Sequence, residues 1–196
     1  MPTDSSAHDV APPGPRERIL SVAYELFSTR GIRDVGVEEL IASAAVAKAT
    51  FYRHFPSKDD LVLAFLADRE VRWTYGFVAA GARQRGDTAE ERLLAIFDVF
   101  DGWFADPGFD GGSFMHVLLE MGPGHRLGQA SIEHLRNLRK LAQELAEEAE
   151  LRDPESFARS WHILMEGSIF SATEGDHQAA MRAQEMARDL IERHRP

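Results

Sequence analysis

Residues 41–58 read IASAAVAKATFYRHFPSK. The stretch contains Lys48, Arg53, His54 and Lys58 but no Asp or Glu, although the 196-residue chain has a formal net charge of -10. A cluster of basic groups on an otherwise acidic protein attracts anions to one part of the surface. We therefore interpret this stretch as the part of the chain that meets an anionic partner.

The negative charge is concentrated in the rest of the chain. Residues 14–70 hold eight Lys or Arg and nine Asp or Glu, whereas residues 71–196 hold fourteen and twenty-one. Interactions between exposed charges are largely screened beyond ~8 Å at physiological salt, so an acidic second part does not prevent a local basic surface from binding phosphate. The charge distribution therefore remains compatible with a nucleic-acid partner.

The composition predicts a soluble globular protein and suits the reducing cytoplasm. With 44% hydrophobic residues the chain can bury a core, and with no cysteine it can form neither disulfides nor thiolate metal sites. Residues 1–14 have neither a basic start nor an apolar run, so we interpret them as a disordered lead-in and not as a signal peptide. No uncharged apolar run approaches the ~20 residues needed to cross a bilayer, so no membrane contact is expected.

The apolar spacing predicts three helices in the first part of the chain. Residues 16–30 place their apolar side chains on one helix face and are followed by Gly31, a typical helix stop. Residues 37–44 repeat the pattern, and a third helix follows at about residues 47–55. Two short helices joined by a tight turn, the second with a basic outward face, describe a helix-turn-helix.

The third predicted helix has one inward and one outward face. Phe51 and Phe55 are four residues apart and share the inward face, whereas Ala49, Thr50 and Arg53 lie on the opposite side. Small and hydroxyl side chains allow a helix to enter the major groove, and basic side chains donate to guanine or to phosphate. The helix is therefore expected to read DNA.

The predicted DNA contacts include three residues for which a second interpretation stays open. Arg16, at the start of the first helix, either reaches a phosphate or is a solvated helix end. Tyr52 and His54 either donate to phosphate oxygens or only cap the small core. The full predicted set is Arg16, Lys48, Ala49, Thr50, Tyr52, Arg53, His54 and Lys58.

Residues 16–62, and above all KATFYRHFPSKDDLV, resemble the DNA-binding domain of the TetR family of bacterial repressors. The family signature is an aromatic-Tyr-x-His-Phe-x-x-Lys block, which is matched here by the residues Phe51, Tyr52, His54, Phe55 and Lys58. The resemblance implies that DNA is contacted by Lys48, Thr50, Tyr52 and His54, with Lys58 at a phosphate.

The chain departs from the family pattern at two places. Residues 45–47 read Ala-Val-Ala where the family usually has Gly-Val-Ser, and residues 35–36 read Val-Gly where Thr is usual. Ala45 is therefore expected to adopt a turn conformation that costs a residue with a Cβ about 1 kcal/mol or more. Ala47 cannot cap the third helix with its side chain.

The remainder of the chain is also predicted to be helical. A long helix runs from residue 58 to about 84, and a capping box at Thr88 and Glu91 begins an apolar helix. Further helices are expected after the turns near residues 112, 125, 153 and 176. The prediction is an all-α protein of about nine helices, with a helix-turn-helix domain at 15–57 and a helical ligand-binding and dimerisation domain at 58–196.

The second domain contains many aromatic side chains and a few polar ones among them. Taken one by one, the aromatic residues are most simply core, but the resemblance implies an apolar ligand cavity in this region. His116 with Glu120 and His162 with Glu166 are spaced for pairs along a helix, either as satisfied polar groups or as ligand anchors. The predicted ligand-binding set is Trp73, Phe77, Phe97, Phe100, Trp103, Phe104, His116, Glu120, Trp161, His162, Met165 and Glu166.

These patterns favour a transcription regulator, and the expected type is a repressor released from a palindromic operator by a small, largely apolar ligand. The resemblance implies a homodimer formed by the last two helices. The expected partners are double-stranded DNA and a small-molecule effector, with no cofactor, metal or catalytic residue. An all-helical enzyme, or a protein-interaction module that uses the C-terminal cavity, remains the alternative.

Overall fold

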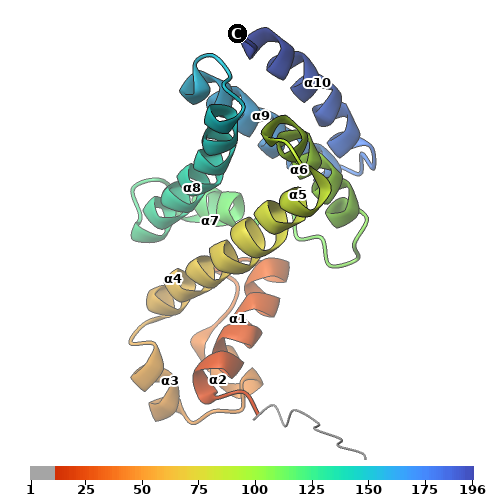
Figure 1. Ribbon diagram of the computed structural model, residues 1–196. Coiled ribbons are helices and arrows are strands. Elements are labelled where there is room, and N and C mark those ends of the chain that lie inside the picture. Colours follow the sequence, from red (N-terminus) through yellow and green to blue (C-terminus); the bar gives the residue numbers. More distant parts are fainter. Residues whose placement is uncertain (1–11) are drawn as a thin grey trace, which may run out of the picture. The chain divides into compact units, whose positions relative to one another are not determined.

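The computed structural model describes residues 12–196, which form helices and no strands (Figure 1). The described residues contain nine helices when three consecutive segments of one continuous helix are counted once, which confirms the predicted all-α fold. Most of the predicted lead-in, residues 1–11, lies outside the described residues. The chain divides into two compact units between Leu61 and Val62.

The N-terminal unit contains α1 (Pro15–Arg30), α2 (Val37–Ser43) and α3 (Lys48–His54). Helix α1 begins at a proline whose lack of a backbone N–H costs nothing at that position, and it ends before Gly31, whose φ of 81° is easily adopted only by glycine. Its inward side chains are buried with those of α2 and α3; this small core contains Ile19, Ala23, Phe27, Leu40, Ile41, Phe51 and Phe55.

The turn between α2 and α3 has the strained backbone that the sequence predicts. Ala45 lies at φ 50°, in the left-handed region where its Cβ crowds the following carbonyl oxygen. Ala47, which precedes α3, has extended backbone and supplies no side-chain cap. The turn is therefore held by its surroundings and not by local preference.

A continuous helix crosses the boundary between the units as α4 (Lys58–Arg69), η1 (Glu70–Ala79) and α5 (Ala80–Arg85). Ser57 caps it, because the backbone N–H of Asp60 donates to Ser57 Oγ at 3.2 Å. The segment η1 is a π-helix of 10 residues, in which each turn takes more residues than in an α-helix.

The π-helical segment corrects the predicted orientation of Phe77. An α-helical period would place Phe77 on the same side as Trp73, but the wider turns of η1 bring Val78 to that side instead. Val78 is fully buried, whereas the Phe77 side chain is 40% exposed. Phe77 was expected to line a ligand cavity, and the structure places it at the surface.

The C-terminal unit continues with α6 (Ala89–Phe104), α7 (Ser113–Met121), α8 (Arg126–Glu148), α9 (Pro154–Thr173) and α10 (Ala179–His194). The predicted capping box begins α6, because Thr88 accepts from the Glu91 backbone and Glu91 accepts from the backbone N–H of Thr88. Helix α9 packs between α8 and α10, and α6 packs on α10 and α5.

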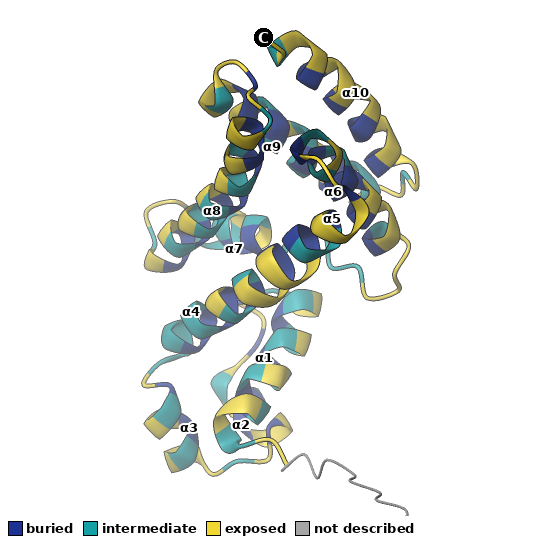
Figure 2. Cartoon of the chain, in the orientation of Figure 1, coloured by how far each residue is buried: buried dark blue, intermediate teal, exposed yellow. Residues whose placement is uncertain are grey.

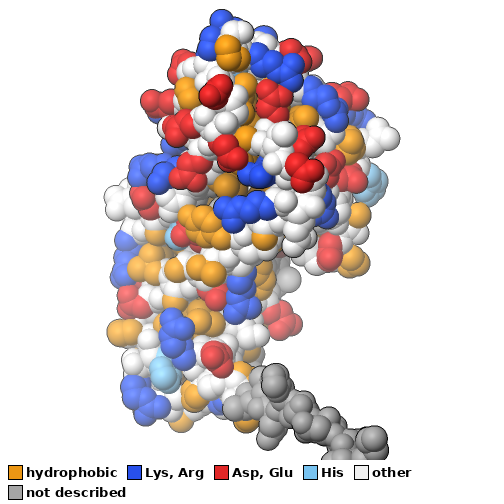
Figure 3. All heavy atoms as spheres, in the orientation of Figure 1, with side chains coloured by type: hydrophobic (Ala, Val, Ile, Leu, Met, Phe, Trp, Pro, Cys, Tyr) orange, Lys and Arg blue, Asp and Glu red, His pale blue; other side chains and the backbone are white. Residues whose placement is uncertain are grey.

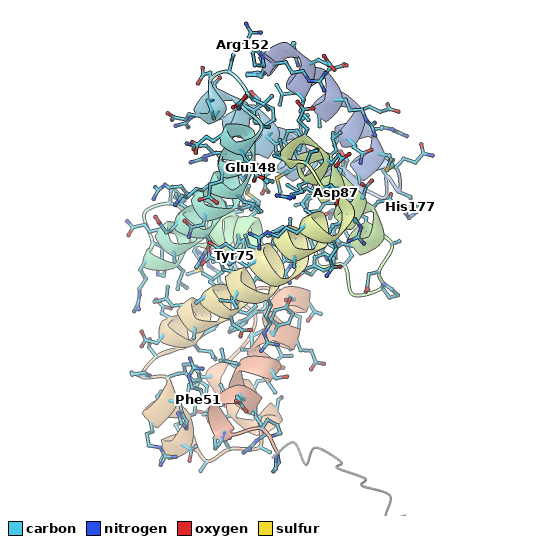
Figure 4. All side chains as sticks on the ribbon, viewed as in Figure 1. Phe51, Tyr75, Asp87, Glu148, Arg152 and His177 are labelled. Atoms are coloured by element: carbon cyan, nitrogen blue, oxygen red, sulfur yellow. The ribbon has the colours of Figure 1, made fainter. Side chains whose placement is uncertain are left out.

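The core of this unit lies where α6 and α9 meet, and α10 covers it with one buried face (Figure 2). Phe97, Phe100, Phe157 and Trp161 have no exposed surface. The connection into α9 is tied to the end of α10, because the backbone N–H of Arg152, labelled in Figure 4, donates to the His194 carbonyl at 2.6 Å. None of the described helices has the length and apolar character needed to cross a membrane.

Replacing Ala45 by glycine should raise the free energy of unfolding of the N-terminal unit by about 1 kcal/mol, because glycine adopts a positive φ without steric cost. The measurement is urea denaturation followed by circular dichroism. Ala42→Gly, at an exposed position inside α2, is the matched control and should lower the free energy of unfolding by about 1 kcal/mol. Equal destabilisation by both substitutions would contradict the assigned strain.

Candidate nucleic-acid interface and ligand pocket

The outward face of α3 is fixed by two buried aromatic residues on its other side. Phe51, labelled in Figure 4, is fully buried, and Phe55 is nearly so, with their ring centroids 6.2 Å apart. The ring of Tyr52 meets Phe51 edge-on at 5.4 Å, which positions Tyr52 while leaving it exposed. Residues on the remaining sides of α3 therefore face outward.

The structure brings the predicted DNA contacts of α3 to one surface. The exposed members are Lys48, Ala49, Tyr52 and Arg53, and Thr50 and His54 are half-buried. Figure 3 shows basic and histidine side chains together in the region of α3. Lys58, half-buried in the first turn of α4, follows this helix after a short bend.

Lys48 is held by a carboxylate that lies outside the basic stretch. Its Nζ lies 2.6 Å from Glu38 Oε1 of α2, and both side chains are largely exposed. The hydrogen bond from Lys48 to Glu38 raises the pKa of Lys48, so this ammonium group is charged at neutral pH. A phosphate that binds Lys48 must therefore compete with Glu38, which lies ten positions earlier on another helix, outside the carboxylate-free stretch.

The two arginines at the start of α1 have different roles. Arg18 donates through Nε to the Ala44 carbonyl at 3.3 Å and through Nη1 to the Pro13 carbonyl at 3.0 Å, so it supports the end of α2. Arg16 remains exposed, with its guanidinium 5.5 Å from the centre of the Phe55 ring. Of the pair, Arg16 is thus the one placed to reach a ligand at the end of α3.

A narrow pocket lies inside the C-terminal unit, among α4, η1, α7, α8 and α9. Its enclosed volume is about 10 Å³, which is room for about one water molecule. The whole empty space, counted together with the open mouth of the pocket, is about 270 Å³. The lining is mainly apolar and aromatic; it consists of Arg69, Trp73, Gly112, Ser113, Phe114, Met115, Leu135, Leu138, Glu166 and Ile169.

Two of the predicted ligand-binding residues, Trp73 and Glu166, line this pocket. Five others belong to the packed core behind it, where Trp73 meets Trp103 at 5.1 Å and Phe97 meets Trp161 at 5.3 Å between ring centroids. These core residues are Phe97, Phe100, Trp103, Trp161 and Met165. Phe104, Glu120 and His162 are half-buried, and His116, like Phe77, is exposed.

A buried ion pair that no local sequence pattern predicts forms one wall of the pocket. Arg69 Nη1 and Nη2 lie 2.8 Å and 2.9 Å from the two carboxylate oxygens of Asp110, and the two side chains are 5% and 9% exposed. Ser113 Oγ also donates to Asp110, at 3.1 Å. The Arg69 guanidinium also lies 5.5 Å from the centre of the Trp73 ring. Asp110 therefore binds the edge of the guanidinium group, and the Trp73 ring covers its face.

Glu166 has a different environment from Arg69. Within the described residues no hydrogen bond or ion pair joins its carboxyl group, and burial raises its pKa to about 7. One turn earlier on α9, burial and then the positive charge of Arg139 lower the pKa of His162 to about 4. At neutral pH His162 is therefore uncharged, and Glu166 is divided between its acid and carboxylate forms.

The Trp73 indole adds a second unsatisfied polar group to the pocket wall. Its Nε1 is buried and has no hydrogen-bond acceptor among the described residues. Buried polar atoms without partners are uncommon in folded proteins, and this N–H is free to donate a hydrogen bond to a molecule in the pocket. No three His, Asp or Glu side chains of the described part come together as a metal site.

The geometry of the N-terminal unit is that of a helix-turn-helix DNA-binding domain. Residues 19–65 match the family model described as "Bacterial regulatory proteins, tetR family". The N-terminal unit therefore contains a DNA-binding domain of this family of transcriptional regulators.

Individual relatives agree with this assignment. Over 88 residues the chain is 30% identical to the uncharacterized HTH-type transcriptional regulator YdgC of Bacillus subtilis, and over 75 residues it is 33% identical to the HTH-type transcriptional regulator EthR of Mycobacterium tuberculosis. These matches cover 43% and 38% of this chain and 45% and 34% of the relatives, so less than half of either relative is spanned.

The similarity to solved structures extends along most of the chain. The crystal structure of SCO4454, a TetR-family transcriptional regulator from Streptomyces coelicolor, superimposes with a TM-score of 0.81 at 27% identity. The match covers 92% of this chain and 95% of that one. The C-terminal unit therefore shares the fold found in a regulator of the same family.

The opposite pKa shifts of Glu166 and His162 predict opposite effects of pH on stability. Because the folded pKa of Glu166, about 7, exceeds its ordinary value of 4.5, its contribution to stability is present below pH 4.5 and is lost as pH rises through 7. Glu166→Gln should therefore gain stability relative to the wild type as pH rises from 5 to 8, measured by urea denaturation.

The matched variant is His162→Gln. The folded pKa of His162, about 4, lies below its ordinary value of 6.5, so its contribution is present above pH 6.5 and is lost as pH falls through 4. This variant should lose stability relative to the wild type as pH rises from 4 to 6.5. The same pH trend in both variants would contradict the assigned environments.

Proposed function

We propose that the chain is a homodimeric repressor that binds a palindromic DNA operator and leaves it when a small ligand binds the C-terminal unit. The observation that carries the DNA-binding part is the surface of α3, where basic, hydroxyl and small side chains lie opposite the buried Phe51. Ala49 and Thr50 are small enough to approach base edges, and the basic groups around them suit the phosphate backbone.

The C-terminal helices support the dimeric part of the proposal. Three large apolar side chains on α9 and α10 are mostly exposed: Ile163 at 71%, Phe170 at 66% and Met186 at 56%. Gly167 lies between Ile163 and Phe170 on α9. Gly167 and Ser171, with Met186, line a groove between the two helices. Exposed apolar side chains next to small residues favour close packing against another helix pair, and a second copy of this chain supplies one.

Pairing of two chains gives the DNA-binding surface its second half. A helix-turn-helix dimer places its two recognition helices about 34–36 Å apart, one turn of DNA. The helix formed by α4, η1 and α5 connects the N-terminal unit to the pocket, since Arg69 and Trp73 on it line that pocket. A ligand that binds better to one position of this helix would shift the dimer away from the DNA-binding spacing.

The DNA-binding part is tested through the pair of Lys48 and Glu38. Glu38→Gln removes the carboxylate that competes with phosphate, and it should tighten binding to the DNA upstream of the protein's own gene by about two- to fivefold. Lys48→Gln should weaken binding to all DNA sequences, because phosphate contacts carry no sequence information. Fluorescence anisotropy at several salt concentrations measures both effects.

Glu39→Gln is the matched control for the change in charge. Glu39 lies next to Glu38 on α2 but pairs with Arg30, so its substitution should leave DNA affinity near the wild-type value. Equal tightening by Glu38→Gln and Glu39→Gln would show only an effect of net charge. If the wild-type chain shows no salt-dependent DNA affinity at all, the proposed function is wrong.

The dimeric part is tested by a charge in the exposed apolar surface. Phe170→Glu should raise the dissociation constant of the dimer at least about tenfold, because a carboxylate would have to be buried at the interface. Analytical ultracentrifugation measures the change. Leu119→Glu, at a side chain of α7 that is 74% exposed, is the matched control and should remain dimeric. A monomeric wild type, or dissociation by both variants, would contradict the assignment.

A further inference from the structure

The charge balance of the pocket in the C-terminal unit points to one class of ligand. Two charged side chains, Arg69 and Glu166, contribute to a lining that is otherwise apolar, aromatic or uncharged. Asp110 occupies both terminal nitrogens of Arg69 at 2.8 Å and 2.9 Å, which neutralises that wall. The carboxyl group of Glu166 is the charge in this lining that has no partner within the described residues.

An anionic ligand suits this arrangement poorly. To reach Arg69 it would have to displace Asp110 from a two-point contact that Ser113 also supports, at 3.1 Å from the carboxylate. It would also be placed in the same apolar space as the Glu166 carboxyl group, where like charges repel strongly. Burying a charge without a partner is costly, so neither wall of the pocket favours an added anion.

A cationic ligand is favoured by the same features. Its charge would complete an ion pair with Glu166 in a medium of low dielectric, and it would remove the cost of leaving that carboxylate alone. The rings of Trp73 and Phe114 line the same space, and aromatic faces attract alkylammonium groups. The raised pKa of Glu166, about 7, agrees with a carboxyl group that lacks a positive partner.

We propose that the effector of this protein is a compact lipophilic cation, an amine or quaternary ammonium on a small apolar body, and that Glu166 is its charge-recognition residue. The inference rests on the proposed ligand response and specifies its chemistry. Its size is limited, because the enclosed space is about 10 Å³ and even with its mouth the pocket offers about 270 Å³. The ligand must widen the pocket, and the flexible Met115 side chain is the lining residue best able to move.

The helix that carries Met115 is short and has a glycine at each end. Helix α7 has only nine residues and lies between Gly112, at φ 89°, and Gly122, at φ 81°. Glycine at both ends permits changes of backbone direction that other residues resist. A shift of α7 would carry Met115 away from the pocket, and it would also move Phe114, whose ring meets that of Trp73 edge-on at 6.4 Å.

The test compares two probes of the same shape, benzyltrimethylammonium and its uncharged carbon isostere, neopentylbenzene. Binding to the full chain in the absence of DNA is measured by isothermal titration calorimetry or by Trp fluorescence. The cation should bind at least about tenfold more tightly than the isostere. Glu166→Gln should remove that preference, while leaving the affinity for the isostere unchanged or higher.

Glu174→Gln provides the matched control, because it removes an exposed glutamate at the C-terminal end of α9 that does not line the pocket. This variant should keep the wild-type preference for the cation. Circular dichroism checks that both variants are folded. A cation preference that survives Glu166→Gln, equal binding of the two probes by the wild type, or no binding of the cation at millimolar concentration would overturn the inference.

The result of this ligand-binding test can be distinguished from a failure of the proposed function. Binding of the cation through Glu166 supports the inference even if the complex with DNA is unaffected, in which case only the release step of the proposed function fails. Release from DNA by the uncharged isostere, without a contribution from Glu166, would support ligand response and overturn the assignment of a cation.

Discussion

The DNA-facing surface depends on the burial of Phe51. Helix α3 has seven residues and no side-chain cap at its start, so it cannot be stable alone, and its orientation is set by what it buries. With Phe51 fully buried against α1 and α2, and Phe55 beside it, the rotation of α3 about its own axis is fixed. Lys48, Thr50 and Tyr52 then take their directions from a residue that itself contacts no ligand.

The C-terminal unit depends in a similar way on the buried pair of Arg69 and Asp110. Removing one member of a buried ion pair leaves an unpaired charge, which costs more than the pair contributes. The pair joins the end of α4 to the loop before α7 across 41 residues of sequence. It therefore fixes the pocket wall where η1 begins, and it leaves Glu166 as the group available to a ligand.

The sequence was informative where local rules decide the structure. The four-residue spacing of Phe51 and Phe55 predicted the inward face of α3, the Thr88 and Glu91 box predicted the start of α6, and Ala45 was correctly expected to be strained. These features require only a helical period, a capping pattern or the steric demand of one Cβ. They need no knowledge of which distant segments meet.

The remaining features depend on distant contacts. Glu38 and Lys48 lie on different helices, and Arg69 and Asp110 are far apart in sequence, so no spacing rule identifies either pair. Buried aromatic residues look alike in a sequence whether they fill a core or line a cavity, which is why Phe97 and Trp161 could not be separated from Trp73. Arg69 did carry a signal, because a charged residue within an apolar helical stripe usually has a buried partner.

The π-helical segment also affects how this chain can be aligned with its relatives. Because Glu70–Ala79 takes extra residues for each turn, its side chains lose the register of an α-helix within the segment. An ungapped alignment with a relative that is α-helical here would pair Phe77 with an inward residue, although Val78 holds that place in this structure. Pocket residues of one such protein can therefore be assigned from those of another only if the alignment has a gap within this continuous helix. Sequence comparison alone gives no reason to introduce that gap.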